Sequence, residues 1–531
     1  MKLISVEKMK ALESAANEGG YSYEKMMLKA GQNLARVVHE RYFEKGITRV
    51  MGLVGGGNNG GDTIIALTAL QKLGWTCSAF MLKEDPQWQT LIIELHANGG
   101  RVVERERFEE ELSHTQLVLD GVMGTGFKMP MSEPFSDFMK KFSKLSQGKI
   151  IVAVDSPSGV DCVTGEVCPE TLHADLTVSM EAVKEGMLKF PAYEFCGEIV
   201  TVDLGIPAKT LKAFETGESV IDAGMVKPML PKRDNKSHKG SFGHLLVCGG
   251  GVNYPGAPML AAKSAYRTGA GLVECAIPER VYGAVVANNL ESIFTILEDE
   301  DGVIAENAAT ILTPKLKDIE CLLIGPGIGR EETTQRFIKR LLFGLNGKNK
   351  SSGAGFVPGM VKATTRDAEE LPPMVIDADA LRLLSEIDLW YEKLPAEAVL
   401  TPHPGEMSAL TGLPIDEIQK DRLEVARRFA QKWGQVVVLK GALTVVASPD
   451  GKTAVLPFAN SALAKAGSGD VLAGMIAGLM TQGVEPYDAA ITGVWLHARA
   501  AEVVVRSQGT TSSLLAGDLI NAIYAAMAEL K

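Results

Sequence analysis

The 531-residue sequence has no long apolar run and no excess of positive charge. No uninterrupted apolar stretch approaches the ~20 residues that a helix needs to span a bilayer, so a transmembrane protein is not expected. The first residues mix lysine with glutamate and lack the apolar centre of a signal peptide. A formal net charge of −11 makes nucleic acid an unexpected partner. We therefore expect a cytoplasmic protein that binds neither membranes nor nucleic acid.

Motifs for disulfides, zinc and P-loop phosphate binding are also missing. The seven cysteines are dispersed, without a C-x-x-C pair or a nearby histidine cluster, a pattern typical of reduced thiols. Neither H-E-x-x-H nor G-x-x-x-x-G-K-[ST] occurs, which argues against zinc proteases and P-loop nucleotidases. What remains is an ordinary globular composition, with 46% hydrophobic and 22% charged residues. The length exceeds that of one hydrophobic core, so more than one domain is expected.

Strand-like apolar runs alternate with helix-like amphipathic segments in the first part of the chain. The predicted strands cover residues 50–54, 77–82, 117–119, 150–154 and 199–204. This alternation predicts a doubly wound α/β domain with a parallel sheet. Residues 205–239 interrupt the pattern with three prolines and many charges, which predicts a domain boundary near residues 210–235.

A second alternating series follows this boundary. Its predicted strands cover residues 244–248, 271–277, 321–324, 374–376, 398–400 and 435–439, followed by a hairpin at 443–457 that turns at Pro-Asp-Gly. The tract 348–367 reads as a loop. We therefore predict two α/β domains, residues 1–210 and 236–531, joined by a linker at 211–235. We also expect a homo-oligomer.

The stretch VMGLVGGGNNGGDTIIALTAL, residues 50–70, contains a G-x-G-x-x-G motif between a strand-like and a helix-like run. This is the outline of a dinucleotide-binding turn, in which Glu84 or Asp85 would bind a ribose. A glycine-rich turn without a ligand remains an open alternative. Asp62 is predicted to be the N-cap of the following helix, where a carboxylate would compete with a bound pyrophosphate. A redox-cofactor site of the usual kind is therefore not favoured.

Polar residues also follow two later predicted strands. Asp120 ends LVLD before a Gly-Thr-Gly loop, and Asp155 ends IIVAVD before Ser-Pro-Ser-Gly. Carboxyl ends of parallel strands line the ligand crevice, and a partly desolvated Asp155 would suit acid–base chemistry. The alternative is that each aspartate only caps the next turn. Asn59, Asp120 and Ser158 together offer hard oxygen ligands for an alkali or alkaline-earth cation.

In this order and spacing, GGGNNGGD, LDGVMGTG and VDSPSGVD resemble the NAD(P)H-hydrate epimerase family, the YjeF N-terminal domain, over residues 5–210. The resemblance implies a Rossmann-like three-layer α/β/α fold that binds hydrated nicotinamide nucleotides with potassium. Asp155 would be the acid–base residue, and Asn59, Asp120 and Ser158 would hold the potassium ion. The implied hydrate contacts are Asn58, Asn59, Gly60, Gly61, Asp62, Gly124, Thr125, Gly126, Phe127, Lys128, Met129 and Pro130. The hydrate is a hemiaminal at C6 of the ring, so its inversion needs only reversible loss and return of the oxygen substituent.

The second half contains NSALAKAGSGDVLAGMIAGLM at residues 460–480. Its glycines precede an apolar helix, and backbone N–H groups at such a helix start form an anion-binding nest, with Asp470 beside it as a base. The alternative is that Asp470 only caps the helix. Further strand-end loops, GPGIG, DAD, TPHPGE and KGALT, supply glycines, carboxylates, His403 and Lys440. Nests, one cation and a base are what a phosphate-handling crevice needs.

These motifs resemble the ribokinase-like superfamily. Together with HKGSFGHLLVCGGGVNYPGAPMLAAKSAYRTGAGLV they resemble the NAD(P)H-hydrate dehydratase family over residues 225–531. The resemblance implies a ribokinase-like α/β/α domain that phosphorylates the hydrate hydroxyl and then eliminates phosphate. Asp470 would deprotonate the hydroxyl, and a magnesium ion would bridge the phosphates of ADP. The implied nucleotide contacts are Lys440, Gly441, Ala442, Leu443, Thr444 and Gly469, and the implied hydrate contacts are Ala257, Gly327 and His403.

The two resemblances together imply a bifunctional repair enzyme. Its first domain would epimerise the R and S hydrates of NADH and NADPH, and its second would dehydrate the S form with ADP, giving AMP and phosphate. A ribokinase-like small-molecule kinase fused to a non-catalytic Rossmann-like binding module remains the alternative. The motifs predict neither a preference between the two hydrates nor a choice between ADP and ATP.

Overall fold

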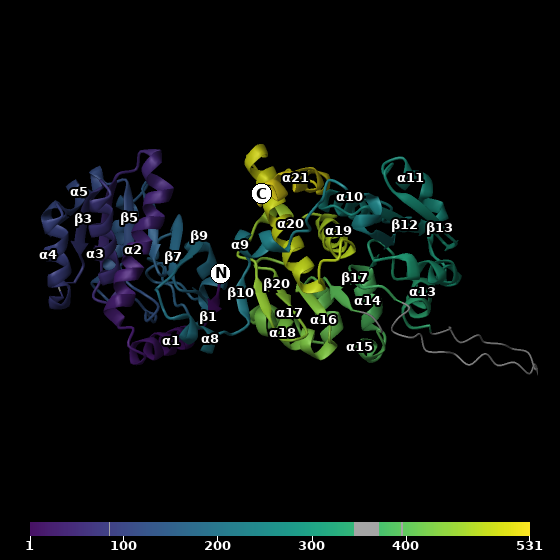
Figure 1. Ribbon diagram of the computed structural model, residues 1–531, viewed down its shortest axis with the longest axis horizontal. Helices are drawn as coiled ribbons and strands as arrows, with labels where there is room; N and C mark the ends of the chain where they lie inside the picture. The colour runs from purple at the N-terminus through teal and green to yellow at the C-terminus, as the bar shows by residue number, and fades with distance from the viewer. Residues whose placement is uncertain (84, 345–370, 395–396) are drawn as a thin grey trace, which may run out of the picture. The chain divides into compact units, whose positions relative to one another are not determined.

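The computed structural model describes residues 1–83, 85–344, 371–394 and 397–531. The chain divides into two compact units, Met1–Val220 and Ile221–Lys531 (Figure 1). The division falls within the segment 211–235, which contains the short strand β10 (Glu218–Val220) and the short helix α9 (Ala223–Val226). In the described ranges no helix combines the length and apolar character that crossing a membrane requires.

A parallel β-sheet forms the centre of the first unit. Its strand order is β4-β3-β2-β5-β6-β7-β9, and neighbouring strands run parallel throughout. The strands are β2 (Arg49–Val54), β3 (Thr76–Met81), β4 (Arg101–Val102), β5 (Leu117–Gly121), β6 (Ile150–Val154), β7 (Leu176–Met180) and β9 (Glu198–Val202). All five predicted strands are present. The sequence patterns missed β4, which is only two residues long, and β7, whose LTVSM mixes polar residues into a fully buried strand.

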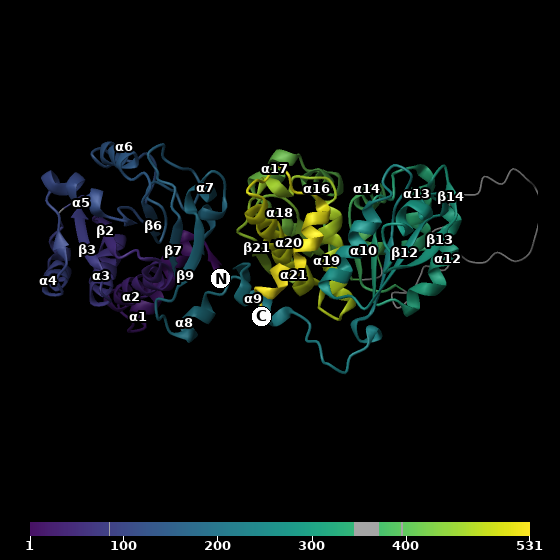
Figure 2. The same ribbon diagram turned by 90° about the horizontal axis from the view of Figure 1, so that it is seen from above.

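Successive strand residues of this unit face two separate apolar cores, because side chains alternate between the faces of a sheet. Val50 and Val54 pack with helices α2 (Tyr23–Tyr42) and α3 (Asn58–Lys72). Met51 and Leu53 pack instead with α5 (Phe108–His114) and α6 (Phe135–Leu145). Figure 2 shows α3 and α6 on opposite sides of the strands. The predicted three-layer α/β/α fold of this unit is confirmed.

Short peripheral elements complete the first unit. The two-residue strand β1 (Leu3–Ile4) pairs in parallel with β8 (Val183–Lys184), so that Ile4 lies opposite Lys184. The remaining helices are α1 (Val6–Glu18), α4 (Gln89–Ala97), α7 (Ala192–Cys196) and α8 (Ala208–Ala213).

A second, mostly parallel sheet forms the centre of the second unit. Its own strands follow the order β21-β20-β19-β18-β17-β16-β11-β12-β13, parallel from β19 to β13, with β20 and β21 as an antiparallel hairpin. They are β11 (His244–Cys248), β12 (Leu272–Pro278), β13 (Ile293–Leu297), β16 (Cys321–Ile324), β17 (Met374–Ile376), β18 (Ala398–Leu400), β19 (Val436–Leu439), β20 (Val445–Ala447) and β21 (Thr453–Val455). Every predicted strand is present, and β13 was missed. The predicted loop at 348–367 lies outside the described residues.

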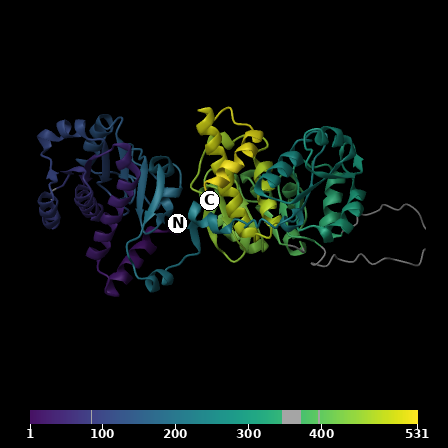
Figure 3. The same ribbon diagram turned by 45° about the horizontal axis from the view of Figure 1, so that its top comes forward.

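Helices cover both faces of this sheet. The long helices α19 (Ser468–Thr481), α20 (Pro486–Gln508) and α21 (Ala516–Ala528) share one apolar core with α10 (Ala257–Thr268) (Figure 3). Figure 2 shows α10 and α14 on opposite sides of the strands. The other helices are α11 (Tyr282–Val286), α12 (Ala309–Leu312), α13 (Glu332–Phe343), α14 (Asp379–Ser385), α15 (Trp390–Lys393), α16 (Pro404–Thr411), α17 (Ile415–Lys420) and α18 (Arg422–Trp433), and a short ribbon is formed by β14 (Asp299–Glu300) and β15 (Val303–Ile304).

The strand order reverses once in each sheet. In the first unit the chain moves outward from β2 and then returns to place β5 on its other side. In the second unit the chain moves outward from β11 and then returns to place β16 on its other side. Loops that leave neighbouring strands at such a point diverge and leave a crevice, which is where open α/β sheets bind ligands.

Two candidate active sites

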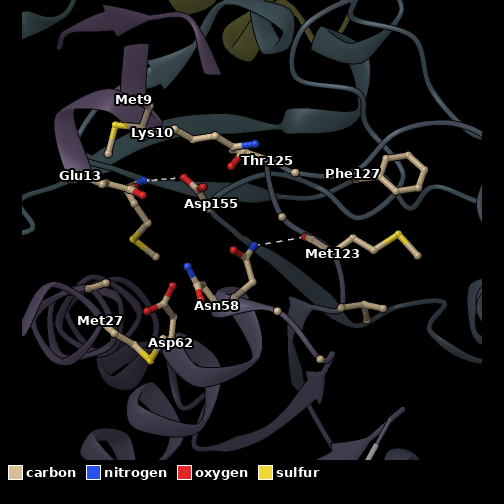
Figure 4. A pocket seen from close by; sticks show the side chains of 18 of the residues that line it. Met9, Lys10, Glu13, Met27, Asn58, Asp62, Met123, Thr125, Phe127 and Asp155 are labelled. Carbon is tan, nitrogen blue, oxygen red and sulfur yellow. Dashed lines mark hydrogen bonds between the residues drawn. The ribbon is translucent and has the colours of Figure 1, made fainter. Parts of the chain in front are cut away.

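A cavity of about 740 Å³ lies at the reversal point of the N-terminal sheet. This volume is in the range of small-molecule and cofactor sites. Loops after β2, β5 and β6 line it, together with α1 and α2 (Figure 4). The lining includes ten of the predicted residues, namely Asn58, Asn59, Asp62, Gly124, Thr125, Gly126, Phe127, Lys128, Pro130 and Asp155. The lining does not include Gly60, Gly61, Met129, Asp120 or Ser158.

Helix α3 begins earlier than the sequence predicts. Its first residue is Asn58 and its N-cap is Gly57, so Asp62 lies one turn inside the helix and the prediction of an Asp62 cap is wrong. Close packing explains the early start: a Cβ on Gly60 would lie 2.2 Å from the Gly55 carbonyl, and one on Gly61 would lie 2.5 Å from the sulfur of Met27. The glycines thus allow close packing along the helix, and the argument against an anion at its N-terminus no longer holds.

Asp85, one of the two residues expected to bind the ribose of a redox cofactor, contacts another protein residue instead. Asp85 accepts hydrogen bonds from the backbone N and the side-chain Nε2 of Gln87, at 3.1 and 2.9 Å, and does not line the cavity. Lys83 lines the cavity at this end of β3, and Glu84 lies outside the described residues. This arrangement disfavours the redox-cofactor hypothesis.

Asp155 is held in one position by a buried network. Its backbone has a φ of +66°, a left-handed conformation that is strained for a residue with a side chain. Its Oδ1 accepts hydrogen bonds from Met180 N at 2.8 Å and Ser179 Oγ at 3.2 Å, and it forms an ion pair with Lys184 Nζ. The Lys184 side chain is only 1% exposed. A strained backbone and three donors on one carboxylate oxygen are the features of a preorganised functional group.

Two more carboxyls, Glu13 and Asp62, lie near Asp155. Burial, together with the negative charges of Asp155 and Glu13, raises the pKa of Asp62 well above its usual value. Burial likewise raises the pKa of Glu13, although Lys184 opposes this shift. Lys184 therefore pairs with Asp155, whereas Glu13 and Asp62 have raised pKa values.

The three residues predicted to hold potassium lie together around the backbone of Met123. Asn59 Nδ2 donates to the carbonyl of Met123 at 3.2 Å, and the Met123 N donates to Ser158 Oγ at 2.9 Å. Asp120 accepts from Ser158 Oγ at 2.6 Å and from Ser158 N at 2.9 Å, and it is 1% exposed. Burial raises the pKa of Asp120, and no basic side chain pairs with it among the described residues. An all-oxygen set around a buried carboxylate without a cationic partner fits a hard cation.

In the second unit, a lysine lies among carboxyls at the carboxyl ends of the strands. Lys440 Nζ is 2.6 Å from Asp377 Oδ1 and 3.9 Å from Glu406 Oε2. Asp377 also accepts a hydrogen bond from Thr401 Oγ1 at 2.6 Å. Burial and the like charge of Asp377 raise the pKa of Asp470 to about 7, and Lys440 opposes this shift. A carboxyl that titrates near neutrality is suited to accept a proton from a hydroxyl.

Asp470 is not a capping residue. Helix α19 begins at Ser468, and its N-cap is Gly467, whose φ of +86° suits glycine. Asp470 therefore lies in the first turn, beside the free N–H groups. A Cβ on Gly469 would lie 3.5 Å from Lys440 Nζ, so the helix start and the lysine adjoin. This geometry favours the predicted base over the alternative of a cap.

His403 caps helix α16 with its ring. Its Nδ1 accepts from Gly405 N at 2.9 Å and from Glu406 N at 3.3 Å, while Glu406 Oε2 accepts from His403 N at 2.7 Å. Burial, Lys440 and Arg382 lower the pKa of His403, which therefore stays neutral, and burial raises the pKa of Glu406. The ring Nε2 lies 3.3 Å from Glu406 Oε1, and the side chain is half-exposed, so the ring can still contact a ligand.

The other predicted contacts of this unit form two groups. A Cβ on Gly327, whose φ is +64°, would lie 3.0 Å from the Cβ of Ala257, so these two predicted hydrate contacts adjoin at the reversal point. The second group is the turn 440–444 after β19, which includes Ala442 and Leu443. A hydrogen bond of 2.8 Å from Thr444 Oγ1 to the Gly441 carbonyl tightens this turn, and Leu443 has a φ of +55°. In the described parts of the chain no hydrogen bond or ion pair joins the two groups.

The sequence reasoning missed Lys184, Glu13 and Glu406. Lys184 lies on a two-residue strand without a periodic pattern, and a lysine inside the apolar segment 176–188 was the only available signal. Glu406 follows His403 at the spacing of a capping box, a pattern that points to it. Glu13 lies on an amphipathic helix, and nothing in its local sequence distinguishes it.

Comparisons with known proteins cover both units. Residues 245–524 match the family described as NAD(P)H-hydrate dehydratase, and residues 23–186 match the family described as YjeF-related protein N-terminus. A bifunctional NAD(P)H-hydrate repair enzyme from Moorella thermoacetica is 32% identical over 98% of this chain and 96% of its own length. The corresponding enzyme from Dictyoglomus turgidum is 31% identical over 100% and 99%, respectively. A solved ADP/ATP-dependent NAD(P)H-hydrate dehydratase from Bacillus subtilis, co-crystallized with ATP/Mg²⁺, is 30% identical, with a TM-score of 0.47 over 59% of this chain and 99% of that chain.

Proposed function

The chain belongs to the family of bifunctional NAD(P)H-hydrate repair enzymes, and from this premise we propose how its two sites divide the work. The N-terminal cavity interconverts the R and S hydrates of NADH and NADPH. The C-terminal crevice dehydrates the S hydrate with ADP and yields AMP, phosphate and the reduced nucleotide. The observation that carries this assignment is a buried carboxyl–lysine pair at the carboxyl ends of the strands in each sheet.

In the N-terminal unit, Asp155 is proposed as the acid–base residue of the epimerisation. Three donors, including Lys184, contact its Oδ1 and fix its direction. The nicotinamide end of the hydrate is proposed to lie between Asp155 and the loop 124–128, with the phosphates near the start of α3. Inversion then needs the C6–O bond to break and re-form, with Asp155 moving the protons that accompany this exchange of oxygen.

A potassium ion is proposed to be held by the side-chain oxygens of Asn59, Asp120 and Ser158. Its charge offsets the buried carboxylate of Asp120 and fixes the loop after β5 beside the substrate. The two hydrogen bonds donated by the Asn59 amide nitrogen leave its oxygen free for this role. The chemistry of the inversion itself stays with the carboxyl groups.

In the C-terminal unit, Asp470 is proposed to take the proton of the hydrate hydroxyl as this oxygen attacks the terminal phosphate of ADP. The free N–H groups at the start of α19 stabilise the negative charge that develops on the transferred group. Lys440, within reach of the same helix start, binds the phosphates as a point charge. A magnesium ion bound with ADP would neutralise phosphate charge. Ala257, Gly327 and His403 are proposed to contact the hydrate.

The decisive experiment supplies the full chain with purified R hydrate or S hydrate, each with ADP, ATP or no nucleotide. We expect NADH absorbance to appear with S hydrate and nucleotide, and R hydrate to be consumed through prior conversion to S. A stable phosphorylated product without NADH would instead support the small-molecule kinase. NADH from the S hydrate but none from the R hydrate, above a no-enzyme control, would make the first unit a binding module.

Two further proposals concern the cellular location and the oligomeric state of the enzyme. Buried, unpaired cysteines and the acidic charge support a cytoplasmic location. Exposed apolar side chains at the edge strand β13, Ile293 and Ile296, support a homo-oligomer. Size-exclusion chromatography with light scattering tests the second proposal directly.

A further inference from the structure

The carboxyl of Asp62 has no structural role that the surrounding residues explain. It lies one turn inside α3, and the residue is only 6% exposed. Among the described residues no hydrogen bond donor and no cationic side chain contacts it. Its oxygens are not among the fully enclosed polar atoms, because the carboxyl borders the cavity. A carboxyl without a protein partner at the wall of a cavity is available to a ligand.

Asp62 points into the same cavity as Asp155. Both residues belong to the lining, one from the helix after β2 and the other from the end of β6 (Figure 4). Their surroundings differ: Asp155 has Lys184 and two further donors, whereas Asp62 has none of these and faces Met27 of α2. Three donors thus hold one carboxyl, whereas burial and the neighbouring negative charges raise the pKa of the other. Two carboxyls with such different surroundings in one site can act as an acid–base pair.

We propose that Asp62 is the general acid of the epimerase site and works with Asp155 as the general base. The inference deepens the proposed epimerase function and rests on it. In one isomer of the bound hydrate, the C6 oxygen lies within hydrogen-bonding reach of Asp62, and Asp155 lies at the opposite face of the ring. For the other isomer the two carboxyls exchange roles.

The proposed step balances without any oxidant or reductant. The lone pair of ring nitrogen N1 forms a C6=N1 double bond as the C6–O bond breaks, and the Asp62 proton leaves with the hydroxyl as water. Water then adds to C6 from the opposite face, its oxygen forms the new C6–O bond, and Asp155 takes its proton. A proton transfer from Asp155 to Asp62 through water restores the starting state. The product is the other epimer, with an oxygen derived from solvent.

Replacing Asp62 in the full chain tests the inference. In Asp62→Asn the shape stays and the acidic proton is lost, so we expect the conversion of purified R hydrate to fall about 10²–10³-fold, the usual contribution of a general acid. Asp62→Glu should recover at least tenfold of this loss, which a purely structural role would not allow. Asp137→Asn makes the same chemical change on the exposed face of α6 and should convert R hydrate at the wild-type rate. Wild-type rates in Asp62→Asn would overturn the inference.

Two measurements separate this inference from the proposed function and from misfolding. In H₂¹⁸O the wild-type enzyme should place one solvent oxygen at C6 for each inversion, and retention of the original oxygen would overturn the step. This measurement needs no variant, so it stands even if Asp62→Asn is unstable. If the wild-type chain does not interconvert the hydrates above the no-enzyme rate, the epimerase function itself fails. If it does so and only Asp62 proves dispensable, the function stands and the general acid lies elsewhere.

Discussion

The two sites use a buried lysine in different ways. In the N-terminal unit the Lys184 side chain is 1% exposed and contacts only protein groups: Asp155, Ser179 Oγ at 3.2 Å and the Met180 carbonyl at 3.0 Å. In the C-terminal unit the Lys440 side chain is 17% exposed, and its neighbours leave it open toward the start of α19. The first lysine fixes the carboxylate that we propose to act on the substrate. The second pairs with Asp377 and lies beside the helix start, where we propose that it also binds a ligand.

This difference matches the two chemistries. The inversion proposed for the first site uses two carboxyls, and the enclosed lysine fixes one of them in position. Transfer of a phosphoryl group needs a mobile cation at the phosphates and a base that can still take a proton near neutral pH. In both units a buried lysine pairs with one carboxyl, and a neighbouring carboxyl has a raised pKa.

The largest expected effect would show that the two sites act independently. In Asp470→Asn we expect the rate of NADH formation from S hydrate and ADP to fall about 10³–10⁴-fold, because the base and its electrostatic role are lost together. Interconversion of the hydrates should be unchanged. NADH absorbance and chromatographic separation of the epimers measure the two activities. A loss of both activities would mean that the sites are coupled and that the comparison drawn above fails.

The reciprocal change should have a slightly smaller effect. In Asp155→Asn we expect interconversion of the hydrates to fall about 10²–10³-fold, while dehydration of purified S hydrate proceeds at the wild-type rate. With R hydrate as the only substrate, NADH formation should then slow to the rate of uncatalysed epimerisation. Unchanged turnover of R hydrate would contradict the assignment of Asp155.

Replacing each lysine in turn should show which of the two has a structural role and which binds a ligand. Lys184→Met leaves Asp155 buried without its partner, so we expect about 3–5 kcal/mol less stability of the first unit and a fall of about 30–100-fold in epimerisation. Lys440→Met should cost less stability and should mainly raise the KM for ADP. Chemical denaturation and steady-state kinetics measure these effects. If Lys184→Met raised only the KM of epimerisation, Lys184 would instead be a residue that contacts the ligand.

The pH dependence of dehydration should distinguish the two sites further. Asp470 must be ionised to accept a proton, and its pKa is about 7, so kcat/KM for the S hydrate should fall about tenfold per unit as the pH drops below 7. Epimerisation should lack this limb, since Asp470 belongs to the other unit and takes no part in it. Initial rates between pH 5 and about 8 test the difference, and the same limb in both activities would refute it.

A modest change should test the proposed cation site. A Cβ on Gly124 would lie 2.4 Å from the Asn59 amide oxygen, so Gly124→Ala should displace that ligand, lower epimerisation about 3–10-fold and raise the potassium concentration needed for half-maximal activity. Gly283→Ala, where a Cβ would meet nothing within 4 Å, serves as the control. Epimerisation that is independent of potassium in the wild-type chain would refute the cation site.

The sequence predicted the fold, and ten of its candidate residues line the N-terminal cavity, because both depend on local patterns. Apolar strands and the loops that follow them define the two sheets, and the parallel arrangement brings Asp155 and the glycine loop to one edge. The start of α3 was mispredicted because it depends on close packing that no local pattern records. Within the helix, Gly60 packs against Gly55 and Gly61 packs against Met27. Lys184 was missed because its partner lies 29 residues earlier in the sequence, and the strand that carries it has only two residues.

That short strand has a consequence for the order of folding. Lys184 is held in register by β1, so the third and fourth residues of the chain secure the lysine of the N-terminal site. During synthesis these residues leave the ribosome long before their partner exists, and they can pair only after residue 184 has been added. The pairing closes a loop of about 180 residues, and contacts of such sequence separation form late because their entropic cost must be met by structure already in place. We therefore expect the N-terminal unit to form its central sheet before the pairing that secures Lys184.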